Sequence, residues 1–152
     1  VVGDKEVTRT HTKVKKRRDY RIMDAGLQKM LQQTIGRRIA PELDKVFHFE
    51  GFRFDRFVVV CYDAERGDYF RIHRDNLSPT TADRAFALTL NLNVAEYEGG
   101  ELVFPEYGPH KYQPISGGGI LFSCSLMHEA LPVRRGRRFA LLTFLRTLSK
   151  NS

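Results

Sequence analysis

Residues 85–94 read AFALTLNLNV, a stretch that alternates large apolar side chains with small or polar ones. A period of two residues predicts a β-strand, in which successive side chains point to opposite faces of the sheet. One predicted face carries Phe86, Leu88, Leu90 and Leu92, and the other carries Ala87, Thr89, Asn91 and Asn93. The apolar side chains of the first face indicate a strand in the middle of a sheet. We therefore expect the polar second face to line a cavity.

Outward from this strand, the same period recurs from residue 49 onward in short runs separated by turns such as DAERGD at 63–68. The chain before residue 49 has helical spacing instead, with Asp24 as an acceptable N-cap. The apolar stripe of this helix is Leu27, Met30, Leu31 and Ile35. Pro41 is predicted to restart a short helix, so that one or two helices precede about eight strands. Strands without crossover helices favour an antiparallel barrel or jelly roll.

Length and composition predict one ordinary globular domain, because 152 residues with 41% hydrophobic and 28% charged residues can bury a core. We expect residues 1–20 to form a basic arm or an edge strand, followed by a single domain over 21–152. Within that domain, residues 21–48 would give helical support and residues 49–147 the jelly roll. The apolar runs are far shorter than a membrane span, so no membrane partner is expected.

The positive charge is concentrated at the N-terminal end. Residues 1–40 carry 11 Lys or Arg against 4 acidic residues, whereas residues 41–152 carry 14 of each. The run KVKKRR at 13–18 contributes most of this excess. We interpret the run as a solvated arm, with nucleic acid or an acidic partner as the alternative.

The cysteines and the N-terminus bear on localisation. Cys61 and Cys124 make neither a disulfide framework nor a zinc-ligand spacing, and both lie in apolar runs. We therefore expect buried free thiols in a reducing, cytoplasmic compartment. The N-terminus has no apolar signal region, and because the chain starts with Val1, we expect a processed chain or a fragment of a longer one.

The stretch FRIHRDN at 70–76 holds a candidate metal site. His73 and Asp75 are two residues apart, so on an extended strand both side chains face the same way. His128 lies in a later apolar segment that is predicted to be a strand or its end. Two histidines and one carboxylate form the facial triad that holds non-haem Fe(II) and leaves coordination positions open.

Arg138 raises this pattern above a bare metal site. It opens another apolar strand ten residues after His128 and could reach the same cavity. A guanidinium offers a planar fork of donors that matches a carboxylate. A catalytic zinc site would not account for this arginine.

The ordered set of HRD at 73–75, His128 and PVRRGRR at 132–138 resembles the Fe(II)/2-oxoglutarate-dependent dioxygenases, specifically the prolyl 4-hydroxylase-like branch. The resemblance covers roughly residues 50–147. Its supporting pieces are CY at 61–62, GDYF at 67–70, LN at 92–93 and GGEL at 99–102. The fold that it implies is a double-stranded β-helix, which is a jelly roll.

The resemblance also implies cofactors and roles. Fe(II) would be held by His73, Asp75 and His128, with 2-oxoglutarate and O2 as co-substrates and ascorbate as a candidate auxiliary reductant. Arg138 would bind the far carboxylate of 2-oxoglutarate, and the Tyr62 hydroxyl would face the same molecule. Asn91 lies where the oxygen-sensing prolyl hydroxylases have a tyrosine that helps to bind this carboxylate. The implied reaction is hydroxylation of an unactivated C–H bond, with 2-oxoglutarate leaving as succinate and CO2.

The resemblance also bears on the substrate. The resemblance implies a prolyl residue in a peptide or protein, with Arg84 and Arg71 as candidate substrate contacts. The basic arm raises nucleic-acid demethylation as an alternative. Such enzymes have two arginines six residues apart on the last strand. Here Phe144 stands six residues after Arg138, so this signature is missing. A second alternative is a non-catalytic module that binds a metal or a 2-oxo acid and regulates a fused partner. By analogy, the chain would belong to a longer one with a redoxin-type domain.

Overall fold

The computed structural model of the protein describes residues 6–11 and 14–148. The expectations for residues 1–5, 12–13 and 149–152 lie outside the described residues. The helical elements are α1 (Ala25–Phe47), η1 (Val94–Glu96) and η2 (Pro105–Tyr107). The strands are β1 (Glu6–His11), β2 (Lys15–Arg21), β3 (Phe52–Phe54), β4 (Val58–Asp63), β5 (Tyr69–His73), β6 (Arg84–Asn91), β7 (Tyr97–Gly99), β8 (Leu102–Val103), β9 (Lys111–Tyr112), β10 (Gly119–Ser123), β11 (His128–Ala130) and β12 (Val133–Thr147).

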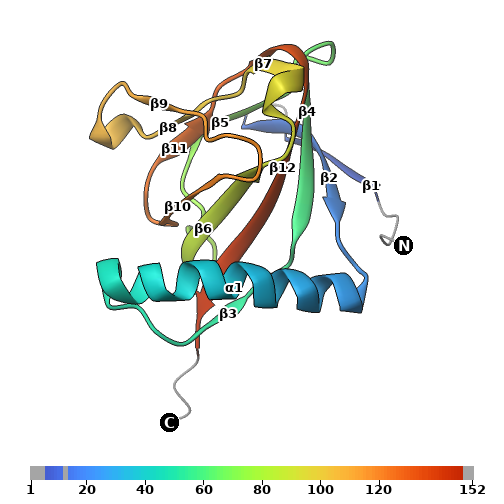
Figure 1. The fold of residues 1–152 in the computed structure, drawn as a ribbon. Helices are drawn as coiled ribbons and strands as arrows, with labels where there is room; N and C mark the ends of the chain where they lie inside the picture. The colour runs from blue at the N-terminus through green and yellow to red at the C-terminus, as the bar shows by residue number, and fades with distance from the viewer. Residues whose placement is uncertain (1–5, 12–13, 149–152) are drawn as a thin grey trace.

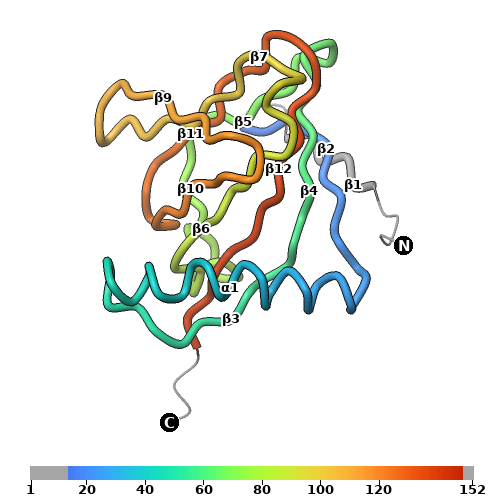
Figure 2. The backbone as a smooth tube through the Cα atoms, in the orientation of Figure 1, coloured from blue at the N-terminus to red at the C-terminus, as the bar shows by residue number. Residues whose placement is uncertain are grey.

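The described strands form one curled antiparallel sheet in the order β10-β6-β12-β4-β2-β5-β11-β8-β9. β1 pairs with β2, and both β3 and β7 pair with β12. Figure 1 shows α1 lying across one end of the sheet, and Figure 2 shows the backbone that carries β7, β8 and β9 at the end away from α1. The predicted mainly β fold of jelly-roll type is confirmed.

The helix is a single element, so a second helix beginning at Pro41 is wrong. Asp24 caps the helix, because its Oδ1 accepts a hydrogen bond from the Leu27 N–H at 2.7 Å. Proline removes one helical N–H, and Pro41 is exposed while Ile35 and Leu43 are buried on either side of it. Continuing the helix through Pro41 keeps both apolar side chains against the sheet, which outweighs the lost hydrogen bond. α1 is not long and apolar enough to cross a membrane, and neither is any other described helix.

The basic N-terminal segment is part of the sheet. β2, which contains most of the KVKKRR run, pairs with β1, β4 and β5. Arg17 within it is buried, with 8% of its surface exposed. The interpretation of this run as a solvated arm is therefore wrong for the described residues from Lys15 onward.

Both faces of β6 are buried, but the strand ends at Asn91, and Leu92, which the alternating pattern predicts on its apolar face, is 46% exposed. Phe86 and Leu88 pack with residues of α1 and β12 on the outer face, whereas Ala87 belongs to a cluster on the inner face with Phe104 and Phe122. Cys61 and Cys124 are buried free thiols, as expected. Burial raises the pKa of Cys124 to about 12, so this thiol stays protonated.

Leu43 ties the end of α1 to the sheet, and its replacement tests this packing. The side chain is fully buried and packs in one cluster with Phe86 and Leu145. Leu43→Ala is expected to lower the free energy of unfolding by about 3 kcal/mol, because the lost contacts leave a cavity. Urea denaturation measures the change, with Val46→Ala as control, since Val46 lies on the same helix with 61% of its surface exposed. Equal effects of the two variants would contradict this packing.

Candidate active site

Three side chains of metal-ligand type meet where β5 ends and β11 begins. Pairing of these strands places His128 directly opposite His73. Asp75 follows β5, and its backbone N–H donates to the Cys124 carbonyl at 3.0 Å. One ligand atom from each of the three residues lies within 4.8 Å of the others. The structure thus brings together the three residues that the sequence predicts as metal ligands.

The distances within this triad fit a single ion. His73 Nε2 lies 3.1 Å from Asp75 Oδ1, and His128 Nε2 lies 3.4 Å from Asp75 Oδ2. Two ligand atoms bound at right angles and about 2.1 Å from an ion are themselves about 3 Å apart. Two imidazole nitrogens and one carboxylate on one side of the ion are the donor set that suits Fe(II).

Backbone carbonyls fix the orientation of both histidine rings. His73 Nδ1 lies 2.7 Å from the carbonyl oxygen of Arg71, and His128 Nδ1 lies 3.0 Å from that of Leu126. A carbonyl oxygen only accepts, so each Nδ1 carries the hydrogen and each Nε2 keeps its lone pair for a metal.

The ionisation of the triad suits metal binding as well. Burial raises the pKa of Asp75, but the close side-chain contact with His73 and the nearby His128 outweigh it and bring this pKa below its ordinary value. Burial lowers the pKa of His128. At neutral pH the site therefore offers a carboxylate and a neutral His128 imidazole, the forms that bind a metal.

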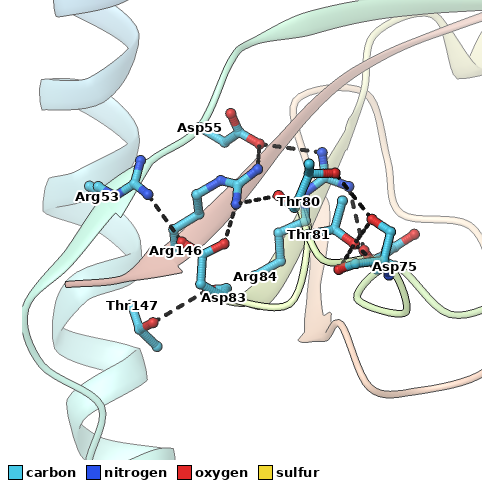
Figure 3. A network of polar contacts seen from close by, with 10 residues as sticks. Arg53, Asp55, Asp75, Thr80, Thr81, Asp83, Arg84, Arg146 and Thr147 are labelled. Atoms are coloured by element: carbon cyan, nitrogen blue, oxygen red, sulfur yellow. Dashed lines mark hydrogen bonds and ion pairs between the residues drawn. The ribbon is translucent and has the colours of Figure 1, made fainter. Parts of the chain in front are cut away.

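A polar network connects the segment after Asp75 to the last strand (Figure 3). Asp55 accepts from both Arg84 at 3.3 Å and Arg146 at 3.1 Å, and Arg146 also pairs with Asp83. Arg84 Nη1 reaches the backbone carbonyl of Asp75 at 3.5 Å. This network lies outside the cavity, and it supports the segment that carries the metal ligand Asp75.

The two arginines predicted to contact substrate lie in different surroundings. Arg84 stacks on Phe144, with its guanidinium carbon 3.8 Å from the ring centroid, and it belongs to the network around Asp55. Arg71 is exposed, and its guanidinium lies 4.3 Å from the centroid of the Tyr69 ring. Neither side chain lines the cavity that holds the triad. A substrate contact by either residue stays a prediction.

Arg138 lies in the same cavity as the triad and is only 5% exposed. It stands opposite Tyr62 across β12 and β4, with its guanidinium 5.3 Å from the Tyr62 ring centroid. Within residues 14–148 it forms no ion pair, and its Nε has no hydrogen-bond partner. A buried, unpaired cation is costly, so this position favours an anionic ligand.

Asn91 binds the arginine, and Gly100 leaves room for its side chain. Asn91 Oδ1 accepts from Arg138 Nη2 at 3.3 Å, while Asn91 Nδ2 donates to the Pro114 carbonyl at 2.9 Å. A Cβ on Gly100 would lie 2.8 Å from Arg138 Cδ, and the positive φ of 70° also favours glycine there. Asn91 itself does not line the cavity, so a direct contact with the co-substrate stays a prediction.

The cavity wall contains two more polar atoms without a partner among the described residues, the hydroxyls of Thr89 and Thr143. Thr89 lies on the same face of β6 as Asn91, lines the cavity, and is 8% exposed. Its hydroxyl has no hydrogen-bond partner in the described part of the chain. Because Thr89 lines the same cavity as Arg138, we expect this hydroxyl to donate to an anionic ligand that Arg138 binds.

Thr89→Val tests this expectation. An unsatisfied buried hydroxyl costs about 1–3 kcal/mol, so the variant without ligand is expected to be at least as stable to urea as the wild type. The affinity of the variant for 2-oxoglutarate is expected to fall about tenfold, because the charged carboxylate of the ligand loses the hydrogen bond that the Thr89 hydroxyl donates. Isothermal titration and urea denaturation give the two values. Lower stability together with unchanged affinity would show that the hydroxyl is structural.

Arg17 is a cavity residue that sequence reasoning missed. Its Nη1 donates to the Tyr62 hydroxyl oxygen at 2.9 Å, and its guanidinium lies 4.9 Å from the Phe70 ring centroid. Its one local sign was Asp19 two residues on, which on a strand lies on the same face as Arg17. Because lysines and arginines surround Arg17 and Asp19, the sequence does not single out this pair.

Comparison with known proteins agrees with this geometry. A family model described as the 2OG-Fe(II) oxygenase superfamily matches residues 57–146. A PKHD-type hydroxylase of Psychrobacter sp. (strain PRwf-1) is 35% identical over 91 residues, which covers 59% of this chain and 35% of that protein. The chain spans only 35–42% of the length of three such curated relatives.

Solved structures share the fold. The 2OG complex of viral collagen prolyl hydroxylase from Paramecium Bursaria Chlorella virus-1 has a TM-score of 0.71 at 20% identity, covering 91% of this chain and 82% of that one. A prolyl hydroxylase from Trichoplax adhaerens, in complex with a peptide fragment of the hypoxia inducible factor oxygen degradation domain, has a TM-score of 0.69 at 18% identity, covering 96% and 70%. Both have the arrangement of elements found here.

Proposed function

Because the chain belongs to the 2OG-Fe(II) oxygenase superfamily, we propose that it hydroxylates an unactivated C–H bond with Fe(II), O2 and 2-oxoglutarate. The observation that supports this proposal most directly is that the triad shares one cavity with Arg138, which has no ion pair among residues 14–148. A metal alone would account for the triad. A buried arginine without an ion pair calls for a ligand with a second anionic group, and 2-oxoglutarate has one.

Each residue has a distinct task in this proposal. His73, Asp75 and His128 would hold Fe(II) through Nε2, a carboxylate oxygen and Nε2. Arg138 would bind the distal carboxylate of 2-oxoglutarate, and the Tyr62 hydroxyl would donate to the same molecule. Bound together, Fe(II) and 2-oxoglutarate would activate O2, which is the oxidant. One oxygen atom would enter the substrate C–H bond and the other would leave in succinate, while the carboxylate next to the keto group would leave as CO2.

The apolar walls of the cavity would shield the reacting region from water. The apolar lining includes Phe70, Leu102, Phe122 and Ala130, and the rings of Phe70 and Phe122 lie against His73 and His128. Phe70 stacks on His73 with ring centroids 3.6 Å apart, which limits movement of that metal ligand. Such walls favour an uncharged reacting group on the substrate.

The substrate that we propose is a prolyl residue in a peptide or protein. Its support is the likeness to prolyl hydroxylases, one of which is seen with a peptide, and the apolar surface beside the triad. The basic run adds no support for a nucleic acid, because β2 is built into the sheet and Arg17 is buried. A reducing, cytoplasmic location and a redoxin-type partner domain stay predictions.

The test is formation of succinate from 2-oxoglutarate, followed by mass spectrometry with Fe(II) and O2 present. Proline-rich peptides and methylated oligonucleotides are offered in parallel. We expect Fe(II)-dependent succinate and a mass increase of one oxygen on the peptides alone. Demethylation of the oligonucleotides would overturn the choice of substrate. Absence of succinate with every substrate, in a protein that binds both Fe(II) and 2-oxoglutarate, would favour the non-catalytic module.

A further inference from the structure

Arg17 reaches the active-site cavity from a strand that precedes the helix and the matched family region. β2 pairs with β4 so that Arg18 is opposite Cys61, which places Arg17 beside Tyr62. Arg17 and Tyr62 are 8% and 3% exposed, and both line the cavity that contains the triad and Arg138. The contact therefore joins the N-terminal strand to the proposed co-substrate pocket.

The direction of the hydrogen bond between them is fixed by chemistry. A guanidinium has donors only, so Arg17 Nη1 donates and the Tyr62 oxygen accepts, at 2.9 Å. The hydrogen of the Tyr62 hydroxyl therefore remains available for another acceptor. The structure gives it none among residues 14–148, and the hydroxyl lies in the cavity wall.

The guanidinium is itself held on three sides. Its Nε donates to Asp19 Oδ1 at 2.7 Å, and its Nη2 donates to Asp19 Oδ2 at 3.4 Å. Its flat face lies over Phe70, whose ring in turn stacks on His73. Burial lowers the pKa of Arg17, but Tyr62 and Asp19 outweigh it and raise this pKa above its ordinary value. The group stays charged and keeps one orientation.

We propose that Arg17 is a positioning residue, which holds the Tyr62 oxygen as an acceptor and so directs the Tyr62 hydroxyl hydrogen toward bound 2-oxoglutarate. This inference rests on the proposed function. Three of the five N–H donors of Arg17 are used by Asp19 and Tyr62, and in this proposal the residue acts on the co-substrate through the tyrosine. Arg17 thereby sets co-substrate affinity without contributing to the metal ligands.

The test is a double-mutant cycle on 2-oxoglutarate binding, measured by anaerobic isothermal titration of the Fe(II)-loaded protein. Arg17→Met and Tyr62→Phe are each expected to weaken binding about tenfold, the size of one hydrogen bond to a charged ligand. The double variant is expected to be no weaker than Tyr62→Phe alone, because both changes remove the same directed hydroxyl. Fe(II) affinity, titrated separately, is expected to stay unchanged.

Arg21→Met is the matched control, since it makes the same substitution on the same strand at an exposed position. Arg17→Lys should recover part of the affinity, because an ammonium can still donate to the tyrosine; this variant also serves if Arg17→Met does not fold. Additive losses in the double variant, or full affinity in Arg17→Met while Tyr62→Phe is weakened, would overturn the inference. A wild-type protein that binds Fe(II) but no 2-oxoglutarate would overturn the proposed function, and this inference with it.

Discussion

His128→Ala is expected to lower Fe(II) affinity by more than about 100-fold, because loss of a direct ligand exceeds the 10- to 100-fold loss that is typical of outer partners. The His128 ring is buried, and its Nε2 lies 3.4 Å from Asp75 Oδ2. Without it, two ligands remain on one side of the ion. Anaerobic titration of Fe(II) against a competing chelator measures the affinity.

His110→Ala is the control for this variant. His110 is an exposed histidine near Tyr112 and takes no part in the triad. Its replacement is expected to leave Fe(II) affinity unchanged. Similar losses in the two variants, or none in either, would place the metal elsewhere.

Arg138→Met is expected to have the opposite profile, with 2-oxoglutarate affinity lowered on the order of 100-fold or more and Fe(II) affinity kept. The reason is that methionine retains much of the apolar stem but removes a charged, two-pronged donor, and each hydrogen bond to a charged group contributes about 1.5–3 kcal/mol. In the ligand-free protein this change removes a buried cation that has no ion pair, but it also removes the hydrogen bond to Asn91 Oδ1, so the two effects on stability are expected to offset each other in part. Isothermal titration with 2-oxoglutarate measures the effect.

Arg137→Met is the matched control, because Arg137 is the exposed neighbour on the same strand. It is expected to bind 2-oxoglutarate as the wild type does. If Arg138→Met loses Fe(II) to the same extent as 2-oxoglutarate, the arginine supports the metal site, and its role as a carboxylate partner is wrong.

Much of this site can be predicted from the sequence, because the period of two along a strand depends only on residues close together in the chain. His73 and Asp75 share a face through the period of two, and the alternation along residues 85–94 correctly indicates a polar wall at Thr89. The spacing of ten residues between His128 and Arg138 predicts that both reach one cavity, but nothing local shows that the strand of His128 pairs with that of His73. The pairing that places His128 opposite His73 is a property of the whole sheet.

The failures have physical causes too. Pro41 predicts the start of a new helix, yet the burial of Ile35 and Leu43 on both sides of it keeps one helix continuous. The basic run that contains Arg17 predicts a solvated arm, because charge alone does not reveal which arginine faces the sheet interior. Only the pairing of β2 with β4 shows that Arg17 stands beside Tyr62.

The most direct measurement is an anaerobic titration of the metal-free protein with Fe(II) and then with 2-oxoglutarate, followed by visible absorption. If the triad and Arg138 form one site, a weak charge-transfer band of a chelated 2-oxo acid appears only when both are present, and it is lost when O2 is admitted. The band should be absent in His128→Ala and should require far more 2-oxoglutarate in Arg138→Met. A folded wild-type protein that shows no band at saturating Fe(II) and 2-oxoglutarate would contradict the assignment of this cavity as a 2-oxoglutarate-dependent iron site.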